Sequence, residues 1–402
     1  MGILNGYRVI DFTSFLSGPL TTCMLSDMGA EVIRIERPDK KIASGPYLGG
    51  ERAYDLSIMR GKKSVTLDAK DPQQHELLVE LIKTADVIVE NFRPGVTKRM
   101  GIAYEDVVQY KPDIIYTSIS GFGQTGPYAK RGALDIVIQA MSGFMSITGE
   151  KDGRPLRAGA SVADMFAGLH AVIGTVAMLL HREKTGEGQH LDVSMLDAMF
   201  GVSCENAVTR YLNFGQIAGR LGNEHPMNTC FGDFPTKDGT IILAANRDNT
   251  YAELCRVLGI EELIDDPRFS TCNARLERRD EIHGLIRAKT AEWETKPLAD
   301  ALLKVGVPCG MINNIKQACE DECIQARNMI IEVDHKTAGT YKVPNSALHF
   351  SKTPPEIKHG APILGQNNRE IFSELGMSGE EIDELLKKQS KVRTMFKENA
   401  LD

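Results

Sequence analysis

Short apolar runs alternate with longer amphipathic segments over the first two hundred residues of the chain. The apolar runs predict buried strands, at 7–12, 31–36, 64–67, 86–89 and 113–119. A helix is predicted at 20–28, where Gly29 follows the last apolar position, and another at 72–84, where Asp71 precedes a proline in the first helical turn. We therefore expect an α/β fold with a Rossmann-like large domain, whose mostly parallel sheet is covered on both faces.

The pattern changes after a polar break that follows residue 215. Two short strands, 230–234 and 240–244, are predicted there, and charged amphipathic helices follow at 275–290 and 296–304. This half of the chain therefore predicts a smaller α+β domain. The predicted division of the chain is a large domain at 1–215 and 340–402, a small domain at 225–335, and linkers at 216–224 and 336–345.

Composition and charge exclude several classes of protein. The chain has 402 residues, of which 42% are hydrophobic and 25% are charged, so it is long enough for two or three globular domains and is not a small disulfide-stapled fold. Its net charge of −7 supplies no basic field, so no nucleic-acid partner is expected. No leader peptide or long uncharged apolar run is visible, so we expect a cytoplasmic protein without a membrane partner.

The cysteines are dispersed along the chain without a C-x-x-C pair. This spacing favours free thiols in a reducing compartment, and no metal site is expected. Only Cys319 and Cys323 are close together, on a predicted helical stretch, and metal or redox use of this pair is the alternative.

A glycine-rich stretch follows the strand predicted at 113–119. Gly121, Gly123 and Gly126 fit the G-x-G-x-x-G spacing of dinucleotide-binding turns. In such turns the glycines open a helix whose N-terminus faces the pyrophosphate, but here Pro127 follows at once and the next helical pattern begins later. A plain turn and a mobile loop over an active site are therefore alternatives to a nicotinamide-dependent enzyme.

Several blocks, taken in order, resemble a known family. They are Asp11-Phe12 with Gly18-Pro19, Gly29 to Pro38, Gly61 to Ser64, Glu90 to Gly95, Gly121 to Pro127, Ala163 to Gly168, Lys184 to Gln189 and Pro362 to Gln366. In this order they are similar to the class III (CaiB/BaiF-type) coenzyme A transferases, the group of formyl-CoA transferase and carnitine CoA-transferase. The resemblance implies a large and a small domain, a homodimer of two interlocked rings, and CoA and acyl-CoA as substrates without a tightly bound cofactor.

The same resemblance implies that Asp164 is the nucleophile of a CoA transfer. A carboxylate that attacks a thioester forms a mixed anhydride, which the released CoA thiolate can convert into an enzyme-bound thioester, whereas attack by water would discard the activation. From the local pattern alone, 158–183 predicts a loop followed by a packed helix, and Asp164 could simply cap that helix. Both roles are compatible, because a helix N-terminus favours a carboxylate.

The family also implies which residues contact CoA. Arginine and lysine pair with its phosphates, and apolar side chains flank the adenine. For Lys70 and Arg99, solvated surface charge is the alternative. The implied contacts are Phe15, Leu16, Ser17, Arg37, Leu67, Lys70, Asn91, Phe92, Arg99 and Met100.

Two departures from the family pattern limit which reaction and which acceptor acid are expected. The related α-methylacyl-CoA racemases have a histidine base in the block after the glycine loop, where this chain has Leu134 before Asp135. Racemisation needs an acid and a base across one carbon, so CoA transfer is favoured. For Asp135, an active-site role and a packing or capping role are the alternatives. Formyl-CoA transferase has a glycine-rich loop where this chain reads Leu243 to Arg247, so formate is not the expected acceptor.

Two arginines that precede the predicted nucleophile suggest the acceptor. Arg154 and Arg157 could pair with the second carboxylate of a dicarboxylic acid such as succinate, and ordinary loop arginines are the alternative. Gly121, Gly123 and Gln124 are further candidates for contact with the substrate. We therefore predict a CoA transferase that moves CoA from an acyl-CoA donor to a free carboxylic acid. A racemase and a non-catalytic protein that binds CoA esters are the alternatives.

Overall fold

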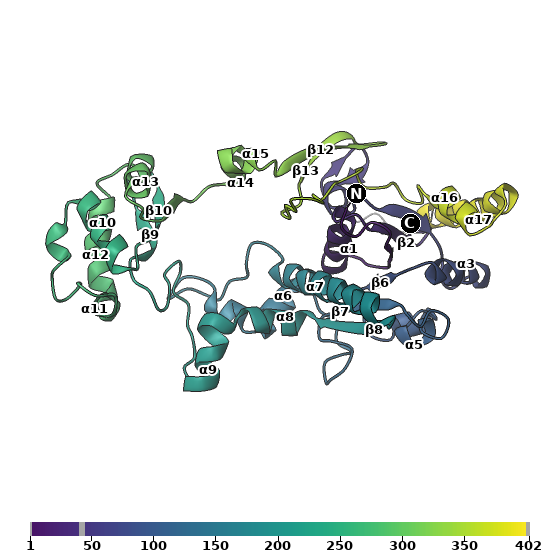
Figure 1. The fold of residues 1–402 in the computed structure, drawn as a ribbon, viewed down its shortest axis with the longest axis horizontal. Helices are drawn as coiled ribbons and strands as arrows, with labels where there is room; N and C mark the ends of the chain where they lie inside the picture. The colour runs from purple at the N-terminus through teal and green to yellow at the C-terminus, as the bar shows by residue number, and fades with distance from the viewer. Residues whose placement is uncertain (1, 40–44, 399–402) are drawn as a thin grey trace. The chain divides into compact units, whose positions relative to one another are not determined.

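A computed structural model describes residues 2–39 and 45–398 of the chain (Figure 1). The chain forms two compact units. The first unit contains the residues up to Ser142, Ala158–Val202, and the residues from Cys323 onward. The second unit contains Gly143–Arg157 and Ser203–Glu322. The domain boundaries expected from the sequence lie later, at 216–224 and 336–345, and that assignment stays a prediction.

A six-stranded sheet, parallel throughout, forms the centre of the first unit. Its strands, in spatial order, are β5 (Lys63–Thr66), β2 (Glu31–Glu36), β1 (Arg8–Asp11), β6 (Val87–Glu90), β7 (Ile115–Ser120) and β8 (Gln189–Ser194). Val9 lies opposite both Val32 and Val87. The strand order reverses between β1 and β6, and in such sheets ligands bind outside the carboxyl ends of the strands at this reversal.

Helices cover both faces of this sheet. One face packs against α3 (Pro72–Lys83), α5 (Tyr104–Val107), α16 (Asn368–Glu374) and α17 (Gly379–Glu398) through one buried cluster, in which Ile10, Ile33 and Ile88 meet Leu78 and Phe372. The helices α1 (Ser17–Asp27) and α7 (Val162–Thr185) pack against each other and against the strands. The period of two along each strand sends alternate side chains to opposite faces.

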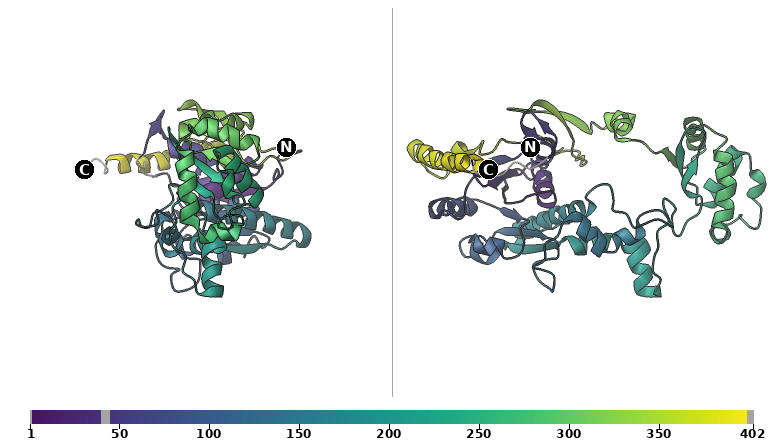
Figure 2. Two further views of the ribbon diagram at one scale, coloured as in Figure 1. Left: turned by 90° about the vertical axis from the view of Figure 1, so that its left-hand side faces the viewer. Right: turned by 180° about the vertical axis from the view of Figure 1, so that it is seen from behind.

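The end of the chain returns to its beginning. The yellow helices α16 and α17 lie beside α3, as Figure 1 and the right-hand view of Figure 2 show. The amide oxygens of Asn367 and Asn368 accept hydrogen bonds from the backbone N–H groups of Ser64 and Thr66, at 3.0 and 2.8 Å. These contacts cover the edge of the sheet at β5, whose backbone groups would otherwise be unpaired.

Shorter elements complete the first unit. A hairpin of β12 (Ile330–His335) and β13 (Gly339–Pro344) packs on α2 (Ala53–Ile58), where the Tyr341 hydroxyl donates to the Leu56 carbonyl at 2.9 Å. The others are β3 (Tyr47–Leu48), β4 (Glu51–Arg52), α4 (Val96–Arg99), α6 (Asp135–Met141), α8 (Met195–Val202), and α15 (Glu322–Ala326) at the boundary between the units.

The second unit has a small antiparallel sheet of its own. Its order is β11 (Cys309–Met311), β10 (Thr240–Ala244), β9 (Phe231–Pro235). Phe234, Leu254, Ile286 and Leu302 belong to one buried cluster between this sheet and the green helices of Figure 1. The helices of this unit are α9 (Thr209–Phe214), α10 (Asp248–Leu258), α11 (Cys272–Glu277), α12 (Arg279–Thr290), α13 (Thr295–Lys304), α14 (Ile315–Glu320), and short 3-10 or π turns at Phe144–Ile147, Cys204–Val208 and Glu261–Leu263.

The predicted fold class, an α/β chain with a mostly parallel sheet and a smaller α+β region, is confirmed. Strand β8 was not predicted, because it is a sheet-edge strand whose Gln189 and Asp192 are exposed and whose apolar positions are few. Helix α7 is, among the described residues, long and apolar enough by length and composition to cross a membrane. Its packing against α1, α8 and β7 accounts for the same apolar positions, as expected of a core helix.

Candidate active site

A cavity of about 690 Å³ lies at the carboxyl ends of β1, β6 and β7, where the strand order reverses. Three segments that follow these strands meet in it with the start of α7. The residues that line it are Ser14, Phe15, Ser17, Asn91, Phe92, Arg93, Pro94, Val96, Ile119, Ser120, Gly121, Arg131, Gly132, Ala133, Leu134, Val137, Asp164 and Met195. The position agrees with the general rule for ligand sites in open α/β sheets.

Asp164 is the carboxylate of this cavity. Burial raises its pKa to about 6, and the nearby Asp135 carboxylate contributes to the rise. The hydroxyl and the backbone N–H of Ser17 lie close enough to Asp164 to oppose the rise in its pKa. The carboxylate is therefore ionised near neutral pH but less strongly solvated than a surface aspartate, which suits a nucleophile.

Two helix N-termini meet at this carboxylate. Asp164 lies in the first turn of α7, and Ser17 is the first residue of α1. The helices can approach closely because Gly168 has no side chain: a Cβ there would lie 2.9 Å from the Ser17 carbonyl oxygen. Free N–H groups and helix dipoles at both ends stabilise negative charge, both on Asp164 and on an oxyanion formed beside it.

Asp135 caps the helix that carries Asp164. Its Oδ1 accepts a hydrogen bond from the Ala163 backbone N–H at 2.9 Å, and its Oδ2 accepts one from Gln139 at 2.7 Å. Gln139 in turn accepts a hydrogen bond from the Ala158 N–H at 2.9 Å. Asp135 thus makes a capping contact, and its charge lies close enough to Asp164 to raise the pKa of the latter.

The loop between β1 and α1 is held over the cavity by Asn91. The Asn91 side chain accepts a hydrogen bond from the Ser14 N–H at 2.8 Å and donates one to the Ser14 carbonyl at 2.7 Å. Phe15 is in the left-handed region (φ 63°), and 73% of its surface is exposed. Strain of this kind in a non-glycine residue persists where the surrounding structure imposes it, which is common at ligand sites.

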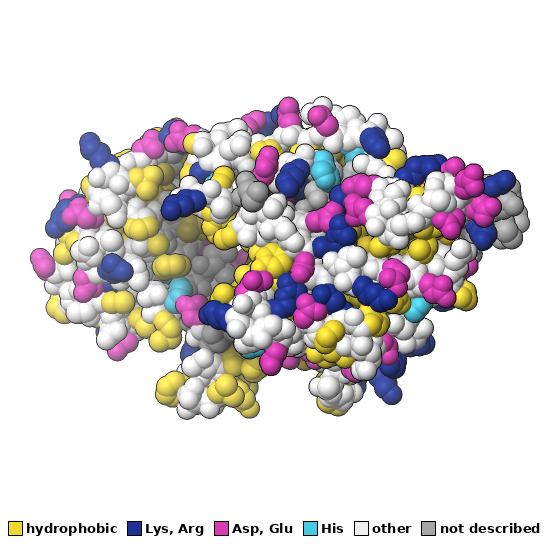
Figure 3. All heavy atoms as spheres, turned by 45° about the vertical axis from the view of Figure 1, so that its right-hand side comes forward, with side chains coloured by type: hydrophobic (Ala, Val, Ile, Leu, Met, Phe, Trp, Pro, Cys, Tyr) yellow, Lys and Arg dark blue, Asp and Glu magenta, His cyan; other side chains and the backbone are white. Residues whose placement is uncertain are grey.

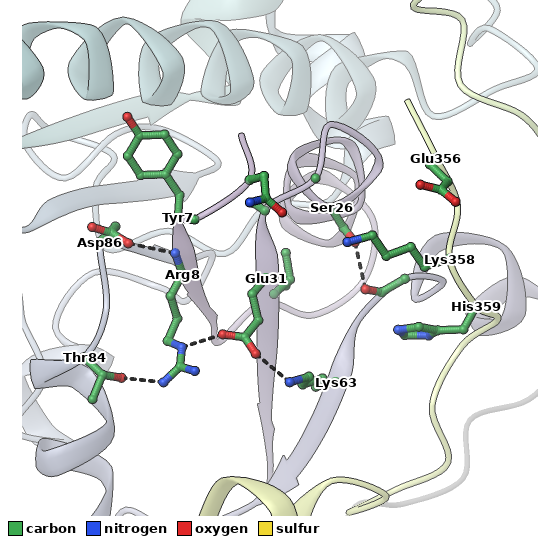
Figure 4. A pocket seen from close by; sticks show the side chains of 16 residues that line it. Tyr7, Arg8, Ser26, Glu31, Lys63, Thr84, Asp86, Glu356, Lys358 and His359 are labelled. Atoms are coloured by element: carbon green, nitrogen blue, oxygen red, sulfur yellow. Dashed lines mark hydrogen bonds and ion pairs between the residues drawn. The ribbon is translucent and has the colours of Figure 1, made fainter. Parts of the chain in front are cut away.

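A second cavity, of about 470 Å³, lies at the opposite, amino ends of the strands (Figure 4). Its charges neutralise one another: Glu31 accepts hydrogen bonds from Arg8 at 2.6 Å and from Lys63 at 2.5 Å. Arg182 pairs with Asp86 at 2.8 Å. Neither Asp164 nor any residue of the predicted CoA set lines this cavity, so it is not the candidate site.

The model of CoA-transferase family III matches residues 4–368. The chain belongs to this family. It is 38% identical over 92% of its length to succinate–glutarate CoA-transferase from Agrobacterium fabrum, of which 95% is covered. It is 36% identical over 93% of its length to acetyl-CoA:oxalate CoA-transferase from Acetobacter aceti, of which 96% is covered. The crystal structure of a CaiB/BaiF family protein from Brucella suis superimposes with a TM-score of 0.82 at 35% identity, over 93% of this chain and 99% of that one.

Part of the residue set implied for family III lines the cavity. Phe15, Ser17, Asn91, Phe92, Gly121 and Asp164 are brought together there. The other implied CoA contacts lie outside it: Leu16, Leu67 and Met100 pack against apolar clusters, Arg37 forms a bidentate pair with Asp39 at 2.8 Å, and Lys70 and Arg99 are exposed. Their roles stay predictions.

The glycine loop continues away from the cavity. Gly123 has a positive φ of 83°, and the Gln124 N–H donates to Asp192 Oδ2 at 2.8 Å, which ties the loop to β8. No helix follows these glycines before α6, so they do not form the strand–turn–helix arrangement of a dinucleotide site. The loop thus connects β7 to a wall of the family III cavity.

Arg154 and Arg157 belong to the second unit, in the segment Gly143–Arg157, and both are exposed. The stretch Leu243 to Arg247, where formyl-CoA transferase has its glycine-rich loop, is the end of a strand and its continuation here, and Leu243 and Ala245 are buried in the core of that unit.

Sequence reasoning missed several residues of the cavity. Arg93 and Arg131 line it and have exposed side chains. The Ser120 hydroxyl also lines it; it is buried and is without a hydrogen-bond partner among the described residues. Tyr54 lies near enough for Asp164, after burial, to help raise its pKa to about 12, which keeps the phenol neutral. Ser120 had a signal that could have found it, since it ends a parallel strand at the carboxyl edge.

The part of the chain that the structure describes contains no group of three histidine, cysteine or acidic side chains placed to hold a metal ion. The cysteines whose side chains it describes are free thiols. Figure 3 shows acidic and basic side chains interspersed over one face of the molecule, without a continuous basic area on that face.

Proposed function

We propose that this protein moves CoA from an acyl-CoA to a dicarboxylic acid, with Asp164 as the nucleophile. The observation that carries the proposal is the place of the Asp164 carboxylate: in the cavity at the reversal of strand order, between the N-termini of α1 and α7, with a pKa raised by burial to about 6.

The reaction proceeds by four acyl transfers. The Asp164 carboxylate attacks the thioester carbonyl, the C–S bond breaks, and the CoA thiolate leaves a mixed anhydride behind. The thiolate attacks the aspartyl carbonyl, which releases the donor acid and forms an aspartyl-CoA thioester. The acceptor carboxylate then attacks this thioester and displaces CoA, which attacks the acceptor carbonyl of the new anhydride and frees Asp164. No net proton or electron is required.

The charge that develops in each tetrahedral intermediate is stabilised by the start of α1. Ser17 lines the cavity with Asp164 and lowers its pKa, and the first backbone N–H groups of this helix have no intrahelical acceptor. These groups belong to elements of fixed position, so little reorganisation accompanies the reaction.

The dicarboxylate class is supported by the relatives and by the charges of the cavity. The curated relatives named above transfer CoA to or from succinate, glutarate and oxalate, by their names. Arg93 and Arg131 line the cavity, and a guanidinium is suited to a carboxylate or a phosphate by bidentate hydrogen bonding. We therefore assign these two arginines, rather than Arg154 and Arg157, to the anionic groups of the substrates.

A racemase of the same superfamily is disfavoured. Leu134 lines the cavity with 61% of its surface exposed, and none of the residues that line it is a histidine. A leucine cannot accept or donate the α-proton.

The protein is also proposed to be a homodimer. Large apolar side chains are exposed on both units: Ile173, Leu180 and Phe200 on the first, and Leu212, Phe214 and Ile217 on the second. Exposed apolar groups in such number are typical of an association surface. Light scattering after gel filtration is expected to give twice the chain mass of 44.2 kDa, and a monomer at micromolar concentration would contradict it.

The decisive experiment combines turnover with trapping. Succinyl-CoA and glutarate are incubated with the protein, and the CoA esters are separated by chromatography; we expect glutaryl-CoA to form. With acyl-CoA alone, hydroxylamine is expected to convert Asp164 to a hydroxamate, detected by mass spectrometry of the peptide. Asp164→Asn is expected to abolish both signals. Transfer by this variant at the wild-type rate would reject Asp164 as nucleophile, and CoA-ester binding without turnover would favour a non-catalytic role.

A further inference from the structure

A fully buried ion pair lies behind the active-site loop. The ammonium group of Lys62 donates to Asp11 Oδ2 at 3.0 Å, to Thr22 Oγ1 at 2.6 Å and to the Pro19 carbonyl at 3.0 Å, and neither charged side chain is exposed at all. These three contacts use the three N–H donors of a lysine.

The other partner of the pair is equally satisfied. Asp11 Oδ1 accepts from the Thr13 N–H at 2.8 Å and from the Thr13 hydroxyl at 2.5 Å, and Oδ2 accepts from the Thr22 hydroxyl at 2.7 Å as well as from Lys62. Burial alone would raise the pKa of Asp11, but Lys62, Arg34 and the two hydroxyls outweigh it and hold the pKa below its ordinary value. With every donor and acceptor used, the pair has no capacity left for a substrate.

Asp11 is joined by a short loop to residues that line the cavity of Asp164. Thr13 packs on Gly18, where a Cβ would lie 2.4 Å from the Thr13 side chain, so the loop has no room to shift on that side. Ser14, Phe15 and Ser17 follow within four residues of Thr13 and line the same cavity as Asp164.

We propose that Lys62 and Asp11 are positioning residues for the CoA transfer: their buried pair holds the Thr13–Ser17 loop so that Ser17 meets the Asp164 carboxylate. The inference rests on the proposed function. A buried ion pair adds little net stability over an apolar pair of the same size, because desolvation of the charges offsets their attraction. Stability therefore does not explain the two charged residues at these positions, and positioning of the loop does. A small displacement of a group that contacts the reacting atoms is enough to slow a reaction by about 100-fold.

The chain supplies a matched control. Arg60 and Asp27 form a second buried pair at 2.7 Å, also between α1 and the segment before β5, but at the far end of α1. Neither residue contacts the Thr13–Ser17 loop through any hydrogen bond that the described residues make. Loss of this pair removes a comparable interaction without touching the loop.

The test compares Lys62→Met with Arg60→Met. For Lys62→Met we expect kcat to fall by about 10- to 100-fold with a change in the KM for acyl-CoA below about threefold, and faster hydrogen exchange at the Thr13–Leu16 amides. For Arg60→Met we expect a comparable loss of thermal stability, but wild-type exchange in the loop and kcat within about twofold. If Lys62→Met does not fold, the isosteric Thr22→Val, which removes one hydroxyl from the pair, is expected to give the same pattern at smaller size.

The outcomes separate this inference from the proposed function. The positioning role is wrong if the wild type transfers CoA and Lys62→Met, or its substitute Thr22→Val, behaves like Arg60→Met. Equal kcat or equal hydrogen exchange in the loop would each show this. If the wild type transfers no CoA to any carboxylate, the proposed function is wrong, and the exchange measurement still decides whether the pair holds the loop.

Discussion

At the scale of single residues, Asp164 is held in an environment that disfavours its charge. Burial and the Asp135 carboxylate raise its pKa from 3.8 to about 6, although Ser17 and two helix N-termini favour the ionised form. Hydrogen bonds to a carboxylate lower its pKa, so the rise at Asp164 comes from burial and from the neighbouring charge. A raised pKa in a cavity is typical of catalytic carboxylates and agrees with the role proposed for Asp164.

The rate of transfer is expected to depend on this ionisation. Because the proposed mechanism uses the ionised carboxylate of Asp164, kcat/KM should fall as the pH decreases through about 6. Asp135→Asn keeps an acceptor for the Ala163 N–H and removes the neighbouring charge, so it should move the midpoint of the pH profile to lower pH. The measurement is initial rate between pH 5 and about 8; a profile without a step in this range would contradict the assignment.

The free energy of unfolding should decrease as Asp164 ionises, whereas the rate of transfer should increase. Because the folded-state pKa is above the unfolded one, the folded state binds the proton more tightly, and Asp164 destabilises the fold increasingly as the pH rises from about 4 to about 6. Asp164→Asn is therefore expected to be more stable than the wild type by roughly 1 kcal/mol at neutral pH, after allowance for partial exposure. Melting temperatures measured at pH 4 and at pH 7 should show the advantage only at pH 7.

At the scale of secondary-structure elements, the contact between α1 and α7 places Ser17 beside Asp164. Gly168 permits it, and the Thr21 hydroxyl donates to the Gly168 carbonyl at 3.2 Å across the contact. The two elements are separated by more than a hundred residues in sequence. Their approach therefore depends on the packing of the whole unit.

Gly168→Ala is expected to lower both stability and activity. Its Cβ would lie 2.9 Å from the Ser17 carbonyl, so the helices must separate, and such overpacking typically costs about 1–3 kcal/mol. Gly201→Ala in α8 is the matched control, because a Cβ there meets nothing and alanine favours a helix, so it should be neutral or stabilising by about 0.5–1 kcal/mol. Denaturant midpoints and kcat for both variants test this; equal behaviour of the two would contradict it.

At the scale of the whole molecule, the first unit is assembled from three separate stretches of the chain. Ile371, Phe372, Ile382 and Leu385, from α16 and α17, belong to the same buried cluster as the first strands. The candidate cavity is lined by segments from the first two hundred residues, but one face of the sheet that carries them is covered only when the chain returns. Folding of the site should therefore require the end of the chain.

Truncation is expected to show this dependence. A chain that ends after Gly365 loses α16, α17 and the four buried apolar side chains just named, so it should fail to fold cooperatively or remain insoluble. A chain that ends after Ser390 keeps these side chains and the hydrogen bond from Gln389 to the Thr66 carbonyl at 2.8 Å, and should melt near the wild-type temperature. Circular dichroism melting of both proteins is the measurement.

The sequence by itself determined the fold class, most strands of the large sheet and, through the resemblance to the family, the candidate nucleophile. These elements could be predicted because their signals are local properties of the chain. The signals are the periods of strands and helices, the Asp71-Pro72 cap and the glycines that follow helices. Asp164 was found because the block around it lies in a fixed order with others that resemble the family.

Only the tertiary structure decided which residues meet. In the structure Ser17 and Asp164 line one cavity, Asp135 accepts a hydrogen bond from the Ala163 N–H, and Ser120 lines the cavity whereas Lys70 does not. These relations join residues that are far apart in sequence, and no local period encodes them. They follow from the strand order of the sheet and from close packing of its helices, which depend on the whole chain at once.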